Sequence, residues 1–422
     1  MDKEEDFIVV VSFFFYLCSG TKKRQLIMSE IQDKHLPETY TIPTLPLPYD
    51  LETKEVLKQV NRANRKLAEL KGVAQTIPNE RILISSLTLQ EAKDSSAVEN
   101  IVTTQDDLYR AGLDTSYQFI NAATKEVLFY REAINEGFQM VRNKDILTLN
   151  DIKRVQEVLE QNSAGFRTTP GTQLKRENDG AIVYTPPQDG QEIIGFMANL
   201  ERFINDGEMS QLDPLIKMAI IHHQFESIHP FYDGNGRTGR IINILYLVIT
   251  GLLDLPILYL SRYITRNKGE YYHLIQAIRD KNTDNAAEWV AWILFMLKGV
   301  ETTAEDTILL VKNIGSLMAE YKGVIRPDFG SKYNHELLNG LFYHPYTKID
   351  HVVHNMQVSR QTAAKYLDRI VALGLLRKEK MGKENYYINT KLMNLFIEFG
   401  KYEPTDNPVI IESVRVEESS KM

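Results

Sequence analysis

The chain has 422 residues, which is too long for one ordinary hydrophobic core, so we expect two or three domains. Its composition, 43% hydrophobic and 25% charged, is that of a globular protein, and its single cysteine, Cys18, excludes a disulfide framework and a zinc site built from cysteines. A net charge of -7 excludes nucleic-acid binding over the whole surface, although a single domain can still bind nucleic acid.

The N-terminal segment contains an apolar run at residues 7–18. This run is shorter than the about 20 apolar residues that cross a bilayer, and the mostly acidic residues 2–6 stand where a secretory signal carries positive charge. We therefore expect residues 1–40 to be disordered or to precede the true start of translation, with Met1 and Met28 both open as that start. Because the chain has one cysteine and no predicted membrane segment, we expect a cytoplasmic protein.

An N-terminal helical region is predicted over residues 41–106. Residues 29–49, polar and then rich in proline, are predicted to be an extended lead-in, after which apolar residues recur at helical spacing over residues 55–70. A second helix is predicted over residues 80–92 and a short third helix over residues 95–100.

A larger helical domain is predicted over residues 107–300, where the helical pattern is nearly continuous. The pattern is broken at residues 165–187, where glycine, proline and threonine dominate. A short extended run within this break, residues 181–184, predicts a hairpin-like flap. Two more helices are predicted on either side of a glycine-rich loop, over residues 213–227 and 236–250.

A different unit is predicted after a linker helix at residues 301–327. Residues 328–400 have the pattern of three helices followed by two strands around a charged turn, which is typical of a winged helix-turn-helix domain. Ser359 is a suitable N-cap for the third of these helices. Residues 401–422 are expected to be a disordered tail. The predicted fold class is therefore all-α, with a short β-hairpin flap and a C-terminal winged helix-turn-helix.

The C-terminal unit is basic within an acidic chain. Its third helix carries polar and basic side chains at residues 359–365 that can contact DNA phosphates or base edges, so one hypothesis is DNA binding through residues 328–390. The alternative is that this unit forms a homodimer or binds another protein, with its lysines simply solvated. The basic residues are Lys332, Lys348, Arg360, Lys365, Arg369, Arg377, Lys378, Lys380 and Lys383.

The strongest chemical signal is the loop at residues 229–240, His-Pro-Phe-Tyr-Asp-Gly-Asn-Gly-Arg-Thr-Gly-Arg. Gly234 and Gly236 let the backbone approach a ligand closely. The helix that starts near Gly236 offers unpaired N–H groups and the positive end of its dipole, which together suit phosphates. Arg237 and Arg240 add guanidinium groups on one face of the first turn.

Three further side chains of the loop suit group transfer from a nucleotide. Asp233 supplies a hard oxygen ligand for Mg²⁺. His229, at the entrance of the loop, is suited to act as a general base at neutral pH. Asn235 can orient a phosphate oxygen or the loop itself.

The loop resembles the signature of the Fic family (filamentation induced by cAMP). The resemblance implies an all-helical Fic core that transfers AMP from ATP to a hydroxyl of a target protein and releases pyrophosphate. It implies that His229 deprotonates the Ser, Thr or Tyr hydroxyl, that Asp233 holds Mg²⁺ and that Phe231 anchors the loop. The residues that would bind ATP are Gly234, Asn235, Gly236, Arg237, Gly239 and Arg240, with Arg240 on the γ-phosphate.

Two more segments resemble parts of the family. Tyr184 and Thr185 resemble the flap that aligns a target chain by strand addition, although an ordinary hairpin ended by proline also explains them. Asn243, on the helix after the loop, would reach the adenine. Tyr271 and Tyr272 resemble the segment near the nucleotide base, and an aromatic core explains this pair equally well.

Residues 95–100, Ser-Ser-Ala-Val-Glu-Asn, resemble the Ser/Thr-x-x-x-Glu-Gly/Asn pattern of an inhibitory helix in this family. The resemblance implies that Glu99 pairs with Arg240, so that ATP binds weakly or in an unproductive pose, while Ser95 and Asn100 complete the motif. It also implies a second role, in which Glu99 aligns a water that removes AMP from the modified target. The alternative is a surface glutamate on a helix that Ser95 caps.

Two other functions stay open. One is a Fic fold that uses a different donor. Phosphate-transferring relatives of the Doc type carry Lys at the position of Gly236, so the intact Gly236 and Arg240 favour transfer of AMP from ATP. The other is an ATP-sensing, DNA-binding transcription regulator with little transferase activity, against which the presence of His229, Asp233 and Arg240 together argues. The sequence indicates neither the protein target nor the signal that releases Glu99.

Overall fold

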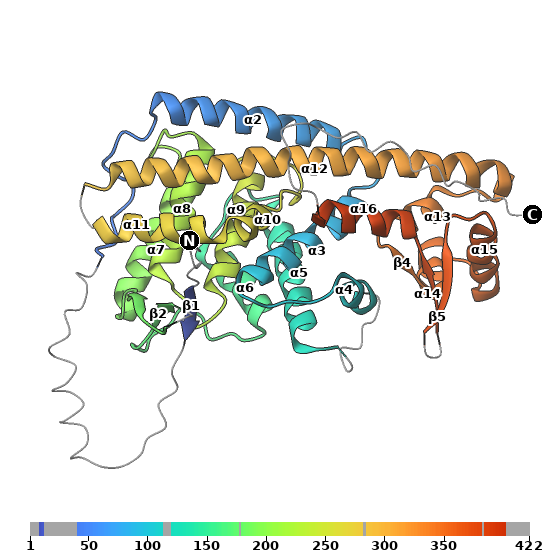
Figure 1. Ribbon diagram of the computed structural model, residues 1–422, viewed down its shortest axis with the longest axis horizontal. Helices are drawn as coiled ribbons and strands as arrows, with labels where there is room; N and C mark the ends of the chain where they lie inside the picture. Colours follow the sequence, from blue (N-terminus) through green and yellow to red (C-terminus); the bar gives the residue numbers. More distant parts are fainter. Residues whose placement is uncertain are drawn as a thin grey trace, which may run out of the picture.

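The computed structural model describes residues 8–11, 40–112, 120–176, 179–281, 284–381 and 384–401. Helices dominate it, so the predicted all-α class is confirmed, and its described strands form two small antiparallel sheets (Figure 1). Among the described helices, none is both long enough and apolar enough to cross a bilayer.

The larger part of the molecule is a helical bundle with a small sheet at one edge. Its elements are β1 Ile8–Val11, α2 Lys54–Ala74, α3 Glu80–Val98, α4 Gln105–Ala111, α5 Ala122–Val141, α6 Leu149–Glu160, β2 Gln173–Arg176, β3 Ile182–Tyr184, α7 Gly190–Asn205, α8 Pro214–Ile228, α9 Asn235–Ile249, α10 Ser261–Arg266, α11 Lys268–Lys281 and α12 Ala286–Phe329.

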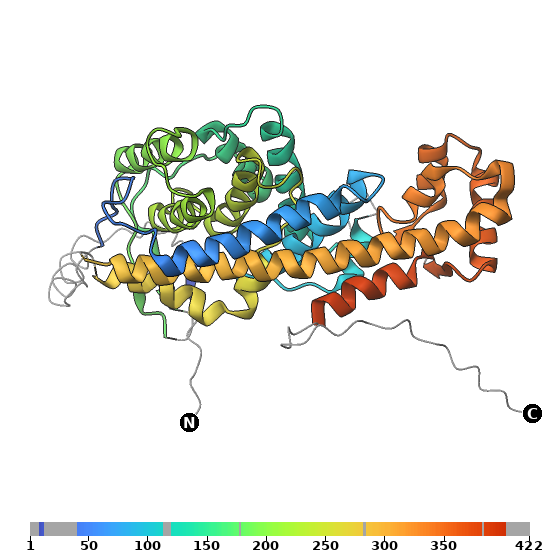
Figure 2. The same cartoon turned by 90° about the horizontal axis from the view of Figure 1, so that it is seen from above.

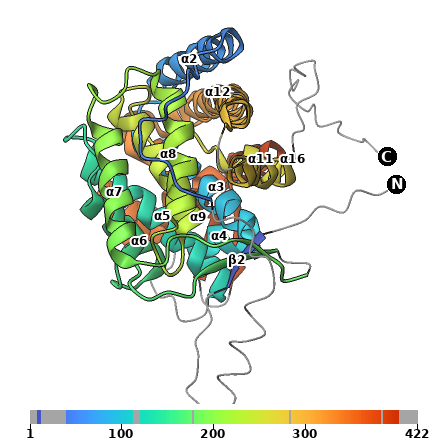
Figure 3. The same ribbon diagram turned by 90° about the vertical axis from the view of Figure 1, so that its left-hand side faces the viewer.

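The central helices of the bundle are α8 and α9. Each is buried around most of its circumference, because apolar residues occur on all of its faces rather than on one. The two helices pack against each other, α8 also packs against α7 and α12, and α9 also packs against α5 and α6. In an end-on view, the helices α5 to α9 gather below the pair α2 and α12 (Figure 3). The glycine-rich loop joins α8 to α9, so both of its ends are held by the buried centre of the bundle.

The helices α2 and α12 run parallel along the length of the bundle (Figure 2). Polar contacts join them in register: Gln59 Nε2 donates to Glu301 Oε2 at 2.8 Å, and Lys66 Nζ lies 2.9 Å from Glu305 Oε1. The linker helix expected at residues 301–327 is the second half of α12, which continues for 44 residues without a break. The boundary predicted at residue 300 therefore falls inside one helix.

The segment that carries the inhibitory motif is also one continuous helix. The prediction of separate helices over residues 80–92 and 95–100 was wrong, because α3 runs unbroken from Asn79, its N-cap, to Glu99, its C-cap. Ser95, which was considered as a helix cap, and its neighbour Ser96 are fully buried within α3. The motif is therefore the last turn of a long helix, and its position is set by the packing of that helix.

The predicted flap is confirmed as the antiparallel hairpin β2–β3. β1 pairs antiparallel with the other edge of β2, which gives the sheet order β1-β2-β3. The sequence did not predict β1, and the remainder of the N-terminal extension expected over residues 1–40 lies outside the described residues. The same is true of the tail beyond Lys401.

The C-terminal unit is built around the far end of α12. Three helices precede the hairpin β5–β6, in the order that the sequence predicts, and β4 extends this sheet in the order β4-β6-β5. Tyr321 of α12 anchors the unit, because its hydroxyl bonds Leu375 O at 2.7 Å and Asn389 Oδ1 at 2.8 Å. The elements are η2 Gly330–Lys332, α13 His335–Gly340, β4 Tyr346–Thr347, α14 Ile349–Met356, α15 Arg360–Ala372, β5 Arg377–Met381, β6 Glu384–Ile388 and α16 Thr390–Lys401.

Two glycines of α12 provide a matched test of how the bundle is packed. A Cβ at Gly299 would lie 2.7 Å from Tyr263 Cδ1 and 2.9 Å from Leu260 Cδ1, whereas a Cβ at Gly323 would meet no atom within 4 Å. We expect Gly299→Ala to lower the free energy of unfolding by about 1–3 kcal/mol. Gly323→Ala should raise it by about 0.5–1 kcal/mol, because alanine favours the helix. Urea denaturation midpoints check both values, and a Gly299→Ala protein as stable as the wild type would contradict the close packing of α10 on α12.

Candidate active site

The glycine-rich loop is held in shape by its own backbone and by Asn235. His229 ends α8 in the left-handed conformation, with φ of 49°, and Gly234 precedes α9 with φ of 75°. The side-chain amide of Asn235 closes the loop, because Phe231 N donates to Asn235 Oδ1 at 2.8 Å and Asn235 Nδ2 donates to Phe231 O at 2.9 Å. Phe231 is fully buried. Of the two roles considered for Asn235, orienting the loop is therefore the one that its contacts favour.

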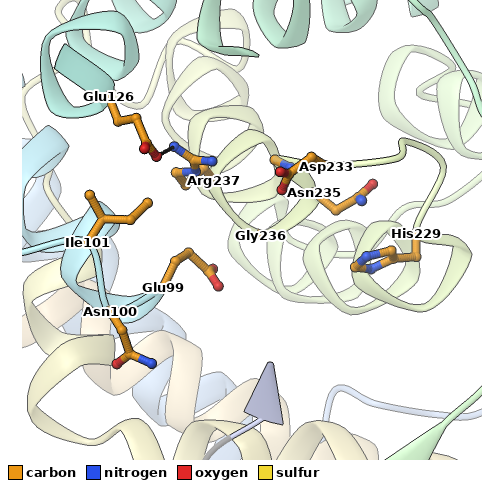
Figure 4. Close-up of a pocket in the computed structure, with 10 residues that line it drawn as sticks. Glu99, Asn100, Ile101, Glu126, His229, Asp233, Asn235, Gly236 and Arg237 are labelled. Carbon is orange, nitrogen blue, oxygen red and sulfur yellow. Dashed lines mark hydrogen bonds and ion pairs between the residues drawn. The ribbon is translucent and has the colours of Figure 1, made fainter. Parts of the chain in front are cut away.

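A cavity of about 200 Å³ opens beside this loop (Figure 4). The carboxylate of Glu99 points toward Gly236, and His229 lies across the cavity from it (Figure 4). The cavity thus brings the end of α3 together with the start of α9. Its lining residues are Glu99, Asn100, Ile101, Glu126, His229, Asp233, Gly234, Asn235, Gly236 and Arg237.

His229 has the properties of a neutral base. Its side chain lines the cavity although only 2% of the residue is exposed, and neither imidazole nitrogen has a hydrogen-bond partner. Burial, together with the positive charges of Arg167 and Arg279, lowers the pKa of His229 to about 3. An uncharged imidazole with a free nitrogen can accept a proton from a hydroxyl group.

Arg240 is held by the last turn of α3. Its Nη2 donates to Glu99 Oε1 at 2.8 Å, and its Nε donates to Ser95 Oγ at 2.7 Å. The Arg240 side chain is 2% exposed and that of Glu99 is 28% exposed, so this ion pair is largely shielded from water. Glu99 also lies against the backbone of Gly236, where any larger residue would collide with Oε1. The carboxylate therefore stands at the start of α9, in the anion cradle that the sequence predicts.

Arg237 is paired as well. Its Nη1 lies 3.1 Å from Glu126 Oε2 and its Nη2 lies 2.8 Å from Glu160 Oε1, while its own side chain is 6% exposed. Burial raises the pKa of Glu160 to about 7, in spite of the opposite effect of Arg237. Both guanidinium groups of the loop thus contact carboxylates that a nucleotide phosphate would have to replace or join.

Asp233 is the residue that could hold a metal ion. It is exposed, it lines the cavity, and its Oδ1 accepts a hydrogen bond from Gly234 N at 2.7 Å. The described residues contain no group of three or more His, Cys, Asp or Glu side chains that could enclose a metal. A single carboxylate fits Mg²⁺ that takes its other ligands from phosphates and water, which is the usual arrangement at nucleotide sites.

The residues predicted for the adenine and the flap lie outside this cavity. Asn243 and Tyr271 are buried and both bond the imidazole of His222, at 3.0 and 2.8 Å. Tyr272 packs edge-on against Tyr271. Gly239 sits where α9 crosses α8, with room for no side chain. These positions belong to the core beside the site, and the structure does not bring them to the cavity wall.

The flap residues also differ in their placement. Tyr184 turns inward, where its hydroxyl donates to Ser227 O at 2.7 Å, and its neighbour Thr185 is half-buried. Asn100, the last residue of the inhibitory motif, lines the cavity in a left-handed conformation and accepts a hydrogen bond from Lys268 Nζ at 3.0 Å.

Sequence reasoning missed several residues that shape the site. Glu126 and Glu160 come from α5 and α6, and no local pattern distinguishes them from ordinary helix-surface acids. Glu91, earlier on α3, is buried and accepts hydrogen bonds from Tyr130 Oη at 3.1 Å and from Ser261 N at 3.2 Å. The signal that could have found Glu91 is an acidic residue on a helix whose faces are mostly apolar. Only the tertiary structure identifies the partners of Glu91.

Comparison with known proteins agrees with this geometry. Family models match residues 57–139 (Fic/DOC family N-terminal), 146–247 (Fic/DOC family) and 317–392 (Protein adenylyltransferase SoFic-like, C-terminal domain). The chain belongs to the Fic/DOC family. The first two matches begin within α2 and end within α9, so they contain residues 95–100, the loop and the carboxylates around it.

The curated relatives of this Fic protein have low sequence identity to it. It is 26% identical over 165 residues to Protein adenylyltransferase Fic of Drosophila erecta and 27% identical over 165 residues to that of Drosophila persimilis. These alignments cover 39% of this chain and only 28% and 27% of the relatives, so the chain spans less than a third of their length. A crystal structure of a Fic family protein from Desulfovibrio desulfuricans G20 has a TM-score of 0.50 and 19% identity, over 81% of this chain and 97% of that one, which supports the fold alone.

The pairing of Arg237 predicts an effect of Glu160 on nucleotide affinity. Replacing Glu160 by Gln removes one of the carboxylates that compete with phosphates for Arg237, and it removes a negative charge from the cavity wall. We expect Glu160→Gln to bind Mg·ATP several-fold more tightly in a Glu99→Gly background, a gain of about 1 kcal/mol, measured by calorimetry.

The control for this measurement is Glu157→Gln. Glu157 lies on the same helix, is 40% exposed and pairs with Arg154 on the surface, so this change should leave the affinity unaltered. Weaker binding in Glu160→Gln alone would show instead that Glu160 holds Arg237 in the orientation that the phosphates need.

Proposed function

We propose that this Fic protein transfers AMP from ATP to a hydroxyl side chain of a target protein and that Glu99 restrains it at rest. The observation that carries the proposal is the Glu99–Arg240 ion pair in a cavity that also contains the neutral base His229. The names of the curated relatives support the same reaction. Because the chain spans less than a third of those relatives, the activity of the whole protein is inferred from the site.

The transfer step follows from the properties of His229. The hydroxyl oxygen of the target attacks the α-phosphorus of ATP and forms a new P–O bond. The bond between the α-phosphorus and the oxygen that bridges to the β-phosphate breaks, and pyrophosphate leaves. The hydroxyl proton passes to a free nitrogen of His229, which is uncharged before the reaction because burial holds its pKa low.

The phosphates would be held at the start of α9. Gly236 lies where the first N–H groups of the helix are unpaired, and the helix dipole favours negative charge there. Mg²⁺ bound to Asp233 would neutralise part of the charge that develops on the pyrophosphate. Arg240 would grip the γ-phosphate once Glu99 has moved away. Arg237 would contribute in the same way after exchanging its carboxylate partners.

Glu99 restrains the reaction because it occupies the place of a phosphate. Its carboxylate holds Arg240 and lies against Gly236, so ATP can enter productively only when this ion pair separates. Breaking a shielded ion pair is unfavourable unless another anion replaces the first one. The same carboxylate, facing the cavity that contains Asp233, is placed to align a water for removal of AMP from a modified target.

Target docking is proposed to use the backbone of the flap. The side chain of Tyr184 is turned into the core, so it is the extended backbone of β3 that is suited to add a strand from the target. β1 already pairs with the other edge of β2. We also propose a homodimer and a cytoplasmic location. Neither is argued from a contact among the described residues.

The alternative function, an ATP-sensing regulator that binds DNA, has weaker support. Five of the nine basic side chains named for the C-terminal unit form ion pairs with acids of the same unit. The ion pairs are Lys348–Glu384, Arg360–Asp350, Arg369–Asp328, Arg377–Glu379 and Lys378–Asp368. Such pairing reduces the positive potential that non-specific DNA binding requires. We expect no binding to a labelled duplex by fluorescence anisotropy at about 0.1 M salt, and salt-dependent binding would favour the regulator.

The transferase proposal is tested by a pair of substitutions. Glu99→Gly should raise the incorporation of labelled AMP from ATP into protein at least tenfold, because Arg240 and the start of α9 become free for phosphates. Adding His229→Ala to Glu99→Gly should reduce incorporation by a factor of about 10²–10⁴, the usual contribution of a general base. Both are measured with radioactive ATP and a cell lysate, followed by identification of the labelled proteins.

Ser95→Ala provides a graded control for the restraint. Ser95 Oγ accepts from Arg240 Nε in a fully buried position, so its loss should weaken the hold of α3 on Arg240 and give activity between the wild type and Glu99→Gly. Labelling by Glu99→Gly that does not exceed the wild type would contradict the restraint. Labelling that persists in the His229→Ala variant would contradict the proposed chemistry.

A further inference from the structure

Arg167, in the segment before the flap, is the charged side chain most completely buried near the base. It is 0% exposed, and no carboxylate of the described residues forms an ion pair with it. Burial lowers its pKa to about 10, which still leaves it charged at neutral pH. Burying the charge of Arg167 without an acidic partner is unfavourable in free energy, because the guanidinium loses its contacts with water. The other contacts of Arg167 must offset that loss.

Those contacts are backbone carbonyls at the end of α8. Arg167 Nε donates to His229 O at 2.8 Å, Arg167 Nη2 donates to Ile228 O at 3.3 Å, and Arg167 N donates to Pro230 O at 2.8 Å. The carbonyl one residue earlier, Ser227 O, accepts from Tyr184 Oη at 2.7 Å. The last carbonyls of a helix lack partners within the helix, and here the flap segment supplies them.

This arrangement determines where the His229 imidazole can lie. His229 has a left-handed backbone, with φ of 49°, which is unfavourable for a residue with a side chain unless its surroundings impose it. Its imidazole nitrogens make no hydrogen bond of normal geometry, and their polar contact is with the backbone of Glu226, so the ring is positioned by the backbone at the end of α8 and by packing. Arg167 holds that backbone on both sides of the Cα, through the carbonyls of Ile228 and His229.

We propose that Arg167 is a positioning residue for the transfer reaction: it clamps the backbone at residues 228–230 and so holds the imidazole of His229 in place. The inference rests on the proposed function for its kinetic consequence. A planar guanidinium can donate to two carbonyls at once, whereas a lysine ammonium at the end of a flexible chain cannot reproduce that geometry. The charged groups that act on His229 are Arg167 and Arg279, the backbone of Glu226 faces its imidazole, and the carboxylates on the same cavity wall are Glu99, Glu126 and Asp233.

The kinetic test uses the unrestrained Glu99→Gly background. Arg167→Met keeps most of the side-chain volume but removes the charge and the donors, and we expect kcat to fall at least 30-fold. The Kd for Mg·ATP should stay within about twofold, because Arg167 contacts no residue of the phosphate cradle. Arg167→Lys should recover only part of kcat. Arg154→Met, on the exposed face of α6, is the matched control and should retain full activity.

The second test measures His229 directly and needs no enzymatic turnover. The imidazole of His229 is followed by NMR as the pH is lowered, in the wild type and in Arg167→Met and Arg167→Lys. Removing a nearby positive charge favours the protonated imidazole, so the pKa of His229 should rise in Arg167→Met and stay close to the wild-type value in Arg167→Lys. Thermal unfolding of each variant shows that the protein under test is folded.

The outcomes separate this inference from the proposed function. If His229→Ala abolishes transfer but Arg167→Met keeps kcat within threefold and the pKa of His229 unchanged, Arg167 is not a positioning residue. If His229→Ala leaves transfer intact, the proposed function fails, and the NMR titration alone decides whether Arg167 acts on His229. Should Arg167→Met not fold, the comparison of kcat and imidazole chemical shift between Arg167→Lys and the wild type decides, and wild-type values for both would overturn the inference.

Discussion

The site depends on one buried ion pair, between Arg240 and Glu99. The Arg240 side chain is 2% exposed, and a guanidinium so deeply buried needs either a carboxylate, as Arg240 has in Glu99, or carbonyl acceptors, as Arg167 has in Ile228 and His229. Burial lowers the pKa of Arg240, and the charge of Glu99 together with Tyr271, Tyr130 and Tyr272 outweighs that effect, so the pKa is raised above its ordinary value. In the proposed function, Glu99 and a nucleotide phosphate compete for this position beside Arg240. Restraint and nucleotide binding would then be two ways of neutralising the same buried charge.

The strength of the restraint depends on how α3 is fixed. Glu91 ties the middle of this helix to Tyr130 of α5 and Ser261 of α10, so the body of α3 is part of the core. Glu99 is the C-cap, followed by Asn100 in a left-handed conformation, and so the acidic group stands where the helix ends. A local change at this end can free Arg240 without unfolding α3, since helix termini open more easily than helix interiors.

The charged groups around His229 are positive on one side of the imidazole and negative on the cavity wall. Behind it, Arg167 and Arg279 add positive charge that disfavours a proton on the imidazole, while burial has the larger effect. On the side of the cavity that faces solvent, carboxylates such as Glu126 and Asp233 line the wall. This distribution keeps the His229 imidazole uncharged, and in the proposed function the carboxylates would favour a divalent cation at the cavity wall. No single residue produces it, because each charge comes from a different element of the bundle.

The sequence by itself determined the loop from His229 to Arg240, because glycines, a helix start and closely spaced charges act within a few residues of one another. It also predicted the mostly helical fold and the flap, which follow from periodicity and turn residues. Only the tertiary structure decided that Glu99 reaches Arg240, 141 positions along the chain, and that Arg167 grips the end of α8. It likewise placed Asn243 in the core, away from the cavity wall. Local patterns record which face of an element is apolar, but the partner of a buried charge is set by how helices distant in sequence pack together, and periodicity carries no information about that.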